Sequence, residues 1–231
     1  MKAMKDLQFL HGIRDALPVC LGIIPVGISF GILALQAGLS AIQAESMSVL
    51  VMAGSSQLMA VGMVGQGAAL ISIVMAVFFL NLRHFVMSSS SMERVKDASL
   101  VKKLLCAFAL CDESFALFSL SGTNSSDYLL GANTALYLAW VGSTVLGCVA
   151  QYLLPEIVAK SFSIAFYAAF FAMLVPKVTG NRRLLLLVLL SAGVNTLLRL
   201  VLPASWSVLL SMILCAWIGT YFCEEEDMQN A

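Results

Sequence analysis

The sequence predicts an all-α membrane protein, and three observations carry that prediction. Apolar residues occupy 60% of the 231 positions and charged residues 11%, less than half the share of about 25% in a typical soluble domain. Mean hydropathy is +0.94. Almost every charged residue lies between long apolar runs rather than inside them. Since one membrane helix needs about 20 apolar residues, there is room for roughly 6–8 membrane segments, and we expect 1–231 to form a single integral-membrane domain.

Short polar or charged stretches divide the chain into successive apolar runs. The sixth run is short and stops at Pro176. The expected membrane segments are 16–35, 47–64, 68–87, 104–120, 129–153, 162–175, 184–202 and 206–222.

The first segment carries both helix-breaking and helix-packing residues. Pro18 and Pro25 each remove a backbone hydrogen bond, so we expect a bent or broken helix there. Gly27 and Gly31 form a G-x-x-x-G pattern that lets a neighbouring helix approach closely.

The charges between segments conflict with plain alternation of crossings. Basic residues follow the third and sixth segments, and the N-terminus is mildly basic; such loops stay in the cytoplasm. The conflict disappears if one of the first three segments does not cross fully and the sixth does not either. We expect these segments to be 47–64, because of its polar centre, and 162–175, because it is short. The alternative is that the charge rule fails for one loop.

Several function classes are excluded or disfavoured by composition. Net charge is zero and no basic stripe with interleaved aromatic residues runs along the chain, so nothing predicts nucleic-acid binding. The six cysteines form no C-x-x-C pair and there are two histidines, so we expect no metal site, cofactor or disulfide framework.

Two adjacent acids inside the fourth segment are the sharpest polar feature. A carboxylate at the bilayer centre costs about 2.5–3.5 kcal/mol on insertion scales. Asp112 and Glu113 are therefore expected to be paired, protonated or hydrated. In the functional interpretation, one of them titrates during transport and the other pairs with a cation. In the alternative interpretation, one forms a structural ion pair and the other reaches the loop. As neighbours they point about 100° apart on a helix and need not share a site.

The third segment ends in a second polar group. Asn81 and His84 share a helix face, with Ser88 one turn further. An imidazole titrates near physiological pH and suits a proton relay, although a hydrogen-bonded helix end accounts for the same residues. Arg83 points elsewhere and is expected to extend toward the basic loop.

Two further polar groups lie in the second and seventh segments. Ser55, Ser56 and Gln57 follow Gly54, where a half-helix N-terminus can bind a carboxylate; helix packing is the rival explanation. On the seventh segment a polar stripe either pairs with the acids of the fourth or lies near the membrane surface. That stripe consists of Ser191, Asn195 and Arg199.

An enzyme is disfavoured. His84 and Ser88 lie on one helix face, where their side chains run roughly parallel instead of meeting as base and nucleophile. The stretch from Gly54 to Gln57 lacks the final glycine expected of an intramembrane serine protease.

Several motifs in matching order resemble the AzlC family, the large subunit of bacterial branched-chain amino acid exporters. Ala53-Gly54-Ser55-Ser56-Gln57, Asn81-Leu82-Arg83-His84, Asp112-Glu113-Ser114-Phe115-Ala116 and Leu174-Val175-Pro176 carry the resemblance. Departures are Phe85-Val86-Met87 after the histidine, and serines where alanines are common.

The resemblance implies a multi-pass permease of the bacterial inner membrane. It would export valine, leucine and isoleucine, with methionine as a further candidate, together with a small hydrophobic subunit of the AzlD type. Ser55, Ser56 and Gln57 would bind the zwitterion, and Asp112 or Glu113, with His84 as relay, would couple export to protons. The alternative from another class is a non-transporting scaffold subunit whose polar residues only hold helices together.

Overall fold

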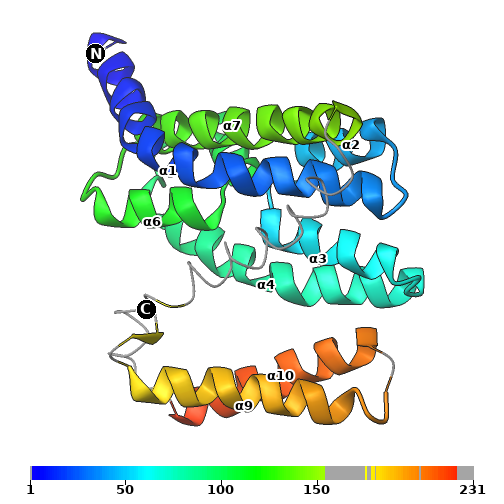
Figure 1. Ribbon diagram of the computed structural model, residues 1–231. Coiled ribbons are helices and arrows are strands. Elements are labelled where there is room, and N and C mark those ends of the chain that lie inside the picture. The colour runs from blue at the N-terminus through cyan, green and yellow to red at the C-terminus, as the bar shows by residue number, and fades with distance from the viewer. Residues whose placement is uncertain (1, 154–174, 176–177, 180, 203, 223–231) are drawn as a thin grey trace.

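The protein is all-helical over the residues that the computed structural model describes, which are 2–153, 175, 178–179, 181–202 and 204–222 (Figure 1). The long helices are α1 (Lys2–Gln36), α4 (Leu70–Arg94) and α7 (Ser126–Leu153). Among the described residues, these three helices are long and apolar enough to cross a membrane. The predicted fold class is therefore confirmed.

Four of the remaining helices are about half as long as a membrane crossing. They have 9 to 12 residues each, which at 1.5 Å per residue gives about 13–18 Å against roughly 30 Å of hydrocarbon. Each therefore reaches only to about the middle of a bilayer. These half-helices are α2 (Ala41–Leu50), α3 (Gly54–Gly65), α5 (Leu100–Phe108) and α6 (Asp112–Leu120).

Helices α9 (Arg182–Leu198) and α10 (Ala204–Phe222) follow toward the C-terminus. They pack against each other, and α10 also contacts α4 (Figure 1). The segment predicted at 162–175 lies almost entirely outside the described residues, so the prediction that it does not cross stays untested.

The pair α2 and α3 forms a re-entrant hairpin that returns to the membrane face from which it starts. Helix α2 begins one short turn after α1 ends, with Ser40 and Gln43 capping each other reciprocally. At the far end of α3, a Cβ placed on Gly65 would lie 3.5 Å from the Cβ of Ala37. The prediction that 47–64 does not fully cross is therefore confirmed.

The pair α5 and α6 forms a second hairpin, so the prediction of one continuous span at 104–120 is wrong. Beyond the end of α6, the backbone carbonyl of Thr123 and the side chain of Asn124 accept hydrogen bonds from Arg94, at the end of α4. Lys102 near the start of α5 pairs with Asp127 at the start of α7. The chain breaks at Cys111, whose backbone is extended, and a new helix begins at Asp112.

The two hairpins enter from opposite sides and define two faces of the protein. The basic face contains the turns between α4 and α5 and between α6 and α7, with Arg94, Lys96, Lys102 and Lys103. The start of α1 lies on the same side, where the Tyr128 hydroxyl donates to Asp15. The neutral face contains the turns 37–40 and 66–69, which carry no charged residue. The conflict among the basic stretches up to residue 153 disappears, because the N-terminus and the 93–103 region share a face.

The units α1–α3 and α4–α6 have the same order of elements in opposite orientations. Their long helices end at Gln36 and Arg94, and their second half-helices follow Ala53 and Cys111; 94 − 36 and 111 − 53 both give 58. Within each unit, a buried serine three residues after the break donates to the carbonyl of the break residue, at 2.9 Å in the first and 3.2 Å in the second. Such inverted repeats frequently enclose a transport site.

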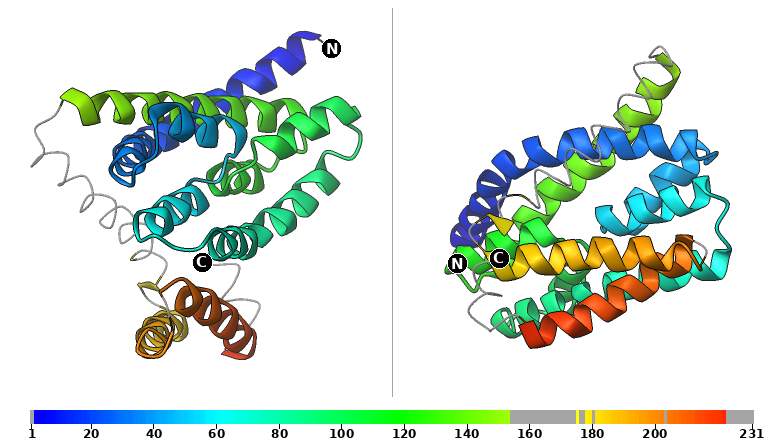
Figure 2. Two further views of the ribbon diagram at one scale, coloured as in Figure 1. Left: turned by 90° about the vertical axis from the view of Figure 1, so that its right-hand side faces the viewer. Right: turned by 60° about the horizontal axis from the view of Figure 1, so that its bottom comes forward.

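Helices α1 and α7 run side by side in the same direction, and glycine allows their close approach (Figure 2). A Cβ on Gly31 would lie 2.5 Å from the Thr144 carbonyl oxygen, and one on Gly147 would lie 2.2 Å from that of Ile28. Figure 2 shows α1 bent, and it continues unbroken through both of its prolines.

Replacing Gly147 with alanine should destabilise the protein, because the added methyl group would meet the backbone of α1. We expect a loss of about 1–3 kcal/mol, typical of overpacked sites, measured as the thermal stability of the detergent-solubilised protein. Gly142→Ala is the matched control, because an added Cβ there meets no atom within 4 Å. Equal effects of both substitutions would contradict the packing described here.

The re-entrant path of α2 and α3 predicts that the two turns at its ends are accessible from the same side of the membrane. In a cysteine-free background, Ser40→Cys and Gln66→Cys should react with an impermeant thiol reagent from one side, and Asp97→Cys from the other. Opposite labelling of Ser40→Cys and Gln66→Cys would mean that this segment crosses.

Candidate functional site

The two hairpin breaks lie at a common cavity of about 470 Å³ in the interior of the protein. That volume lies within the range of roughly 300–1,000 Å³ for small-molecule sites. One wall is apolar and consists of Val19, Ile23 and Val26 from α1, Met52 from the first break and Leu58 from α3. The polar residues that line the cavity are Ser55, Arg83, His84, Asp112 and Glu113.

Arg83 of α4 connects the tips of both hairpins inside this cavity. Its Nη1 lies 2.9 Å from Oδ2 of Asp112 at the start of α6, and its Nη2 donates to the Ser55 hydroxyl at the start of α3. The side chains of Arg83 and Asp112 are 36% and 41% exposed, so the pair faces the cavity. The expectation that Arg83 extends toward the basic loop is wrong, because both hairpin tips offer it acceptors in the interior.

Arg199 does not supply the cation for this acid. It follows the last residue of α9, a helix that packs on α10, and it does not line the cavity. Asn195 also lies on α9 and does not line the cavity, and its Oδ1 is buried without a hydrogen-bond partner among the residues that the structure describes. The structure therefore does not bring these two predicted residues to the site.

Both acids of the predicted pair line the same cavity. Asp112 and Glu113 are the first two residues of α6, directly after the break. Negative charge is stabilised at a helix N-terminus by the exposed N–H groups and the helix dipole. The two side chains share one site because the helix starts with them at the cavity.

Ser56 and Gln57 do not line the cavity, unlike their neighbour Ser55. They are 1% and 3% exposed. The Ser56 hydroxyl donates to the Ala53 carbonyl at the break. Gln57 donates to the Ser48 hydroxyl at 3.3 Å and accepts from the Trp140 indole at 3.0 Å. Ser56 thus stabilises the break itself and Gln57 holds the first hairpin against α7, as the packing interpretation proposed.

His84 lies at the second hairpin break. Its imidazole lines the cavity, and its Nε2 is buried without a hydrogen-bond partner among the described residues. Asn81 lies one turn away on α4 and does not line the cavity; its Oδ1 is also buried and unpartnered in the described part of the chain. His84 therefore has a ring nitrogen that can take a proton or a ligand.

Helix α7 supports both breaks through side chains that sequence reasoning missed. The last carbonyls of a helix have no partner within it. The Tyr137 hydroxyl donates to the Val49 carbonyl near the end of α2, at 2.8 Å. The Asn133 amide donates to the Cys106 carbonyl near the end of α5, also at 2.8 Å. The signal that would have revealed them is the recurrence of polar and aromatic residues every three or four positions in this apolar run.

The chemistry of the cavity suits a small zwitterion with an apolar side chain. A guanidinium can hold a carboxylate through two parallel hydrogen bonds, and the two acids can hold an ammonium group. The aliphatic residues that line the same cavity suit a hydrocarbon side chain. Within the described residues, no group of three or more histidine, cysteine or acidic side chains could hold a metal ion.

Comparison with known proteins gives this site a context. The family model described as AzlC protein matches residues 18–154, which includes both hairpins and every residue named above as lining the cavity. No solved structure matches the chain.

Three relatives illustrate the similarity. An uncharacterized membrane protein of Archaeoglobus fulgidus is 34% identical over 77% of this chain and 79% of its own length. The inner membrane protein YgaZ of Escherichia coli is 30% identical over 60% of this chain and 59% of its own. The branched-chain amino acid transport protein AzlC of Bacillus subtilis is 29% identical over 44% of this chain and 39% of its own.

The resemblance seen in the sequence motifs is confirmed by the family match and by these relatives: the chain is a membrane protein of the AzlC family.

Proposed function

We propose that this protein exports branched-chain amino acids, namely valine, leucine and isoleucine with methionine as a further candidate, across the bacterial inner membrane. The observation that carries the proposal is the Arg83–Asp112 pair, which faces a cavity walled by aliphatic side chains between two hairpin tips. A transport protein of Bacillus subtilis named for branched-chain amino acids is among its relatives. A non-transporting scaffold subunit would need no such cavity.

In the proposed binding mode, the substrate carboxylate takes over hydrogen bonds of Arg83. The guanidinium gives up Asp112 and binds the carboxylate through two parallel hydrogen bonds. Asp112 then binds the ammonium group, while Ile23, Val26 and neighbouring residues contact the aliphatic side chain. Neither Arg83 nor Asp112 is left unpaired in this exchange, which keeps the energy of the substrate in the membrane interior low.

The two hairpins supply the gates of the proposed transport cycle. Each hairpin closes the cavity toward one face, and Arg83 connects both tips. When substrate replaces Asp112 as the partner of Arg83, the second hairpin loses its link to Ser55 and can open. Glu113 and His84 remain the candidates for proton transfer at the cavity.

Orientation and partner follow from charge and from family membership. Basic residues remain cytoplasmic, so the basic face is assigned to the cytoplasm and the neutral face to the outside. Residues 1–231 act as one transport domain in this proposal. A small hydrophobic subunit of the AzlD type assembles with it in the bilayer.

Arg83→Gln and Asp112→Asn should each reduce efflux of preloaded labelled leucine by at least about tenfold, because each leaves a charge unpaired and removes a substrate contact. The double variant has no unpaired charge, so its abundance in the membrane should be higher than that of either single variant, while its efflux should stay low. Lys102→Gln combined with Asp127→Asn is the matched control, since it removes the ion pair on the basic face. Wild-type efflux in either single variant at normal abundance would refute this binding mode.

Glu113→Gln and His84→Ala test the proposed proton transfer at the cavity. Each should abolish the dependence of leucine efflux on the proton gradient while leucine exchange without a gradient persists, because exchange needs binding but no net proton movement. Gradient-dependent efflux at the wild-type rate in both variants would exclude these groups from coupling.

A further inference from the structure

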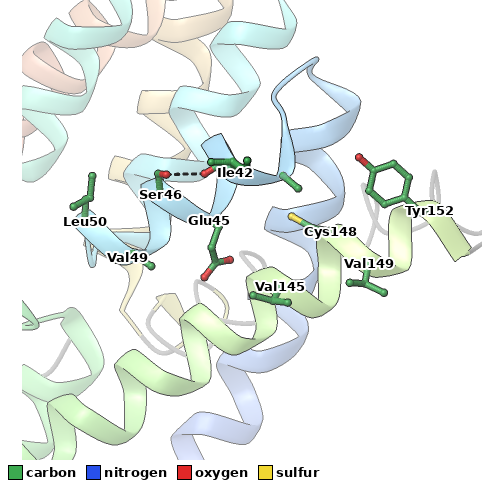
Figure 3. Close-up of a pocket in the computed structure, with 10 residues that line it drawn as sticks. Ile42, Glu45, Ser46, Val49, Leu50, Val145, Cys148, Val149 and Tyr152 are labelled. Atoms are coloured by element: carbon green, nitrogen blue, oxygen red, sulfur yellow. Dashed lines mark hydrogen bonds between the residues drawn. The ribbon is translucent and has the colours of Figure 1, made fainter.

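A second cavity lies between α2 and α7 toward the neutral face, and one carboxylate points into it (Figure 3). Its volume is about 520 Å³. Glu45 of α2 faces α7 across this groove, with Val49, Val145 and Val149 around it (Figure 3). The groove belongs to neither the central cavity nor the Arg83 pair.

Glu45 has no counter-charge within the described part of the chain. Its Oε2 is buried and has no hydrogen-bond partner there. The titratable side chains that α7 presents to the groove are Cys148 and Tyr152, neither of them cationic. Helix α3 and the last 11 residues of α1, 26–36, contain no charged residue. The described basic side chains before residue 153 all lie at the basic face or, for Arg83, at the central cavity.

This environment favours the carboxylic acid over the carboxylate. An unpaired charge at membrane depth is strongly unfavourable, and a protein relieves that by pairing, hydrating or neutralising the group. The described lining of the groove is mostly aliphatic, and none of its hydrogen-bond donors pairs with the Glu45 Oε2. A bound proton therefore neutralises the carboxylate. The ligand that fits Glu45 is therefore H⁺ itself, which converts the carboxylate to the acid when it binds and leaves the carboxylate when it is released.

We propose that Glu45 is a proton-binding site on the first hairpin that takes protons from the neutral face and releases them during the transport cycle. The inference rests on the proposed export function. The neutral face is the side assigned to the outside, from which protons flow inward as substrate leaves. Glu45 thus occupies the side of the protein where an antiporter must receive its protons.

A hydrogen-bonded chain runs from the helical turn next to Glu45 to the central cavity. Ser48 lies one turn after Glu45 on α2, and its hydroxyl is 2.8 Å from that of Thr144 on α7. Gln57 joins Ser48 to Trp140, which lines the cavity. When Glu45 loses its proton, the carboxylate favours water over the groove and draws α2 away from α7, which strains this chain at the hairpin tip. Occupancy of Glu45 therefore controls the position of the first gate.

The first test is chemical and uses the purified full-length protein in liposomes. Dicyclohexylcarbodiimide modifies protonated carboxyl groups in apolar surroundings, and mass spectrometry locates the product. We expect modification at Glu45 that falls by up to about tenfold per pH unit once the pH exceeds the pKa of the group. Glu93, exposed on the basic face, should stay unmodified. Absence of modification at Glu45 at every pH tested would overturn the proposal.

The second test follows leucine efflux from preloaded cells as the external pH is varied. Glu45→Gln is permanently neutral and close in shape, so it should insert normally and flatten the pH profile to less than about a twofold change. Glu45→Asp keeps a titrating group and should retain the profile. Glu93→Gln is the matched control and should also retain it. A wild-type profile in Glu45→Gln would overturn the proposal.

The outcomes separate this proposal from the proposed function. Loss of efflux in Arg83→Gln together with a wild-type pH profile of efflux in Glu45→Gln would support the export function and reject Glu45 as the proton site. Pronounced modification of Glu45 with wild-type efflux in Arg83→Gln would retain the proton site and reject the central binding mode. Lys160 lies outside the described residues; if Lys160→Gln restored function to Glu45→Gln, Glu45 would be one half of an ion pair and the proposal would fall.

Discussion

The structure depends on the requirement that backbone N–H and C=O groups inside a bilayer find partners within the protein. Two of the half-helices, α2 and α5, end near the middle of the membrane, where water cannot satisfy their terminal carbonyls. Asn133 and Tyr137 of α7 do so, one for each hairpin. Helix α7 can reach both ends because glycines bring it against α1 along its length. The hairpins, the cavity between them and the polar residues at their tips all follow from that support.

Once the breaks are supported, the charges at their tips have a defined role. Arg83 would be unfavourable alone at this depth, as would Asp112. Their pairing at 2.9 Å in a partly open cavity satisfies both groups while leaving them accessible. An ion pair between a long helix and a hairpin tip is also a contact that a charged ligand can replace. Structural and functional roles therefore coincide at this pair, whereas Ser56 and Gln57 are committed to packing.

The local sequence pattern was sufficient to predict the class of fold and the polar positions. It did not predict which residues pair across long distances in the sequence. The distribution of basic residues indicated that one of the first three segments does not cross, and the polar centre of 47–64 identified which one. The equivalent break before Asp112 escaped notice because 104–120 is apolar on both sides of it, and periodicity does not show whether an acid interrupts a helix or starts one. Arg83 was expected to point away from His84, yet both line the same cavity, because the partners of Arg83 lie 28 and 29 positions away, at Ser55 and Asp112. Such contacts arise only when the hairpins fold back, which no helical projection reveals.

The dependence of both hairpins on α7 has a consequence for biogenesis. Residues 41–120 leave the ribosome before the side chains of α7 that satisfy their exposed carbonyls. During synthesis the half-helices therefore have no stable place in hydrocarbon, and they must wait at the lipid surface, in the translocation machinery or beside a chaperone until α7 docks on α1. The order of translation makes this fifth membrane element the step that converts a partly inserted chain into a closed fold.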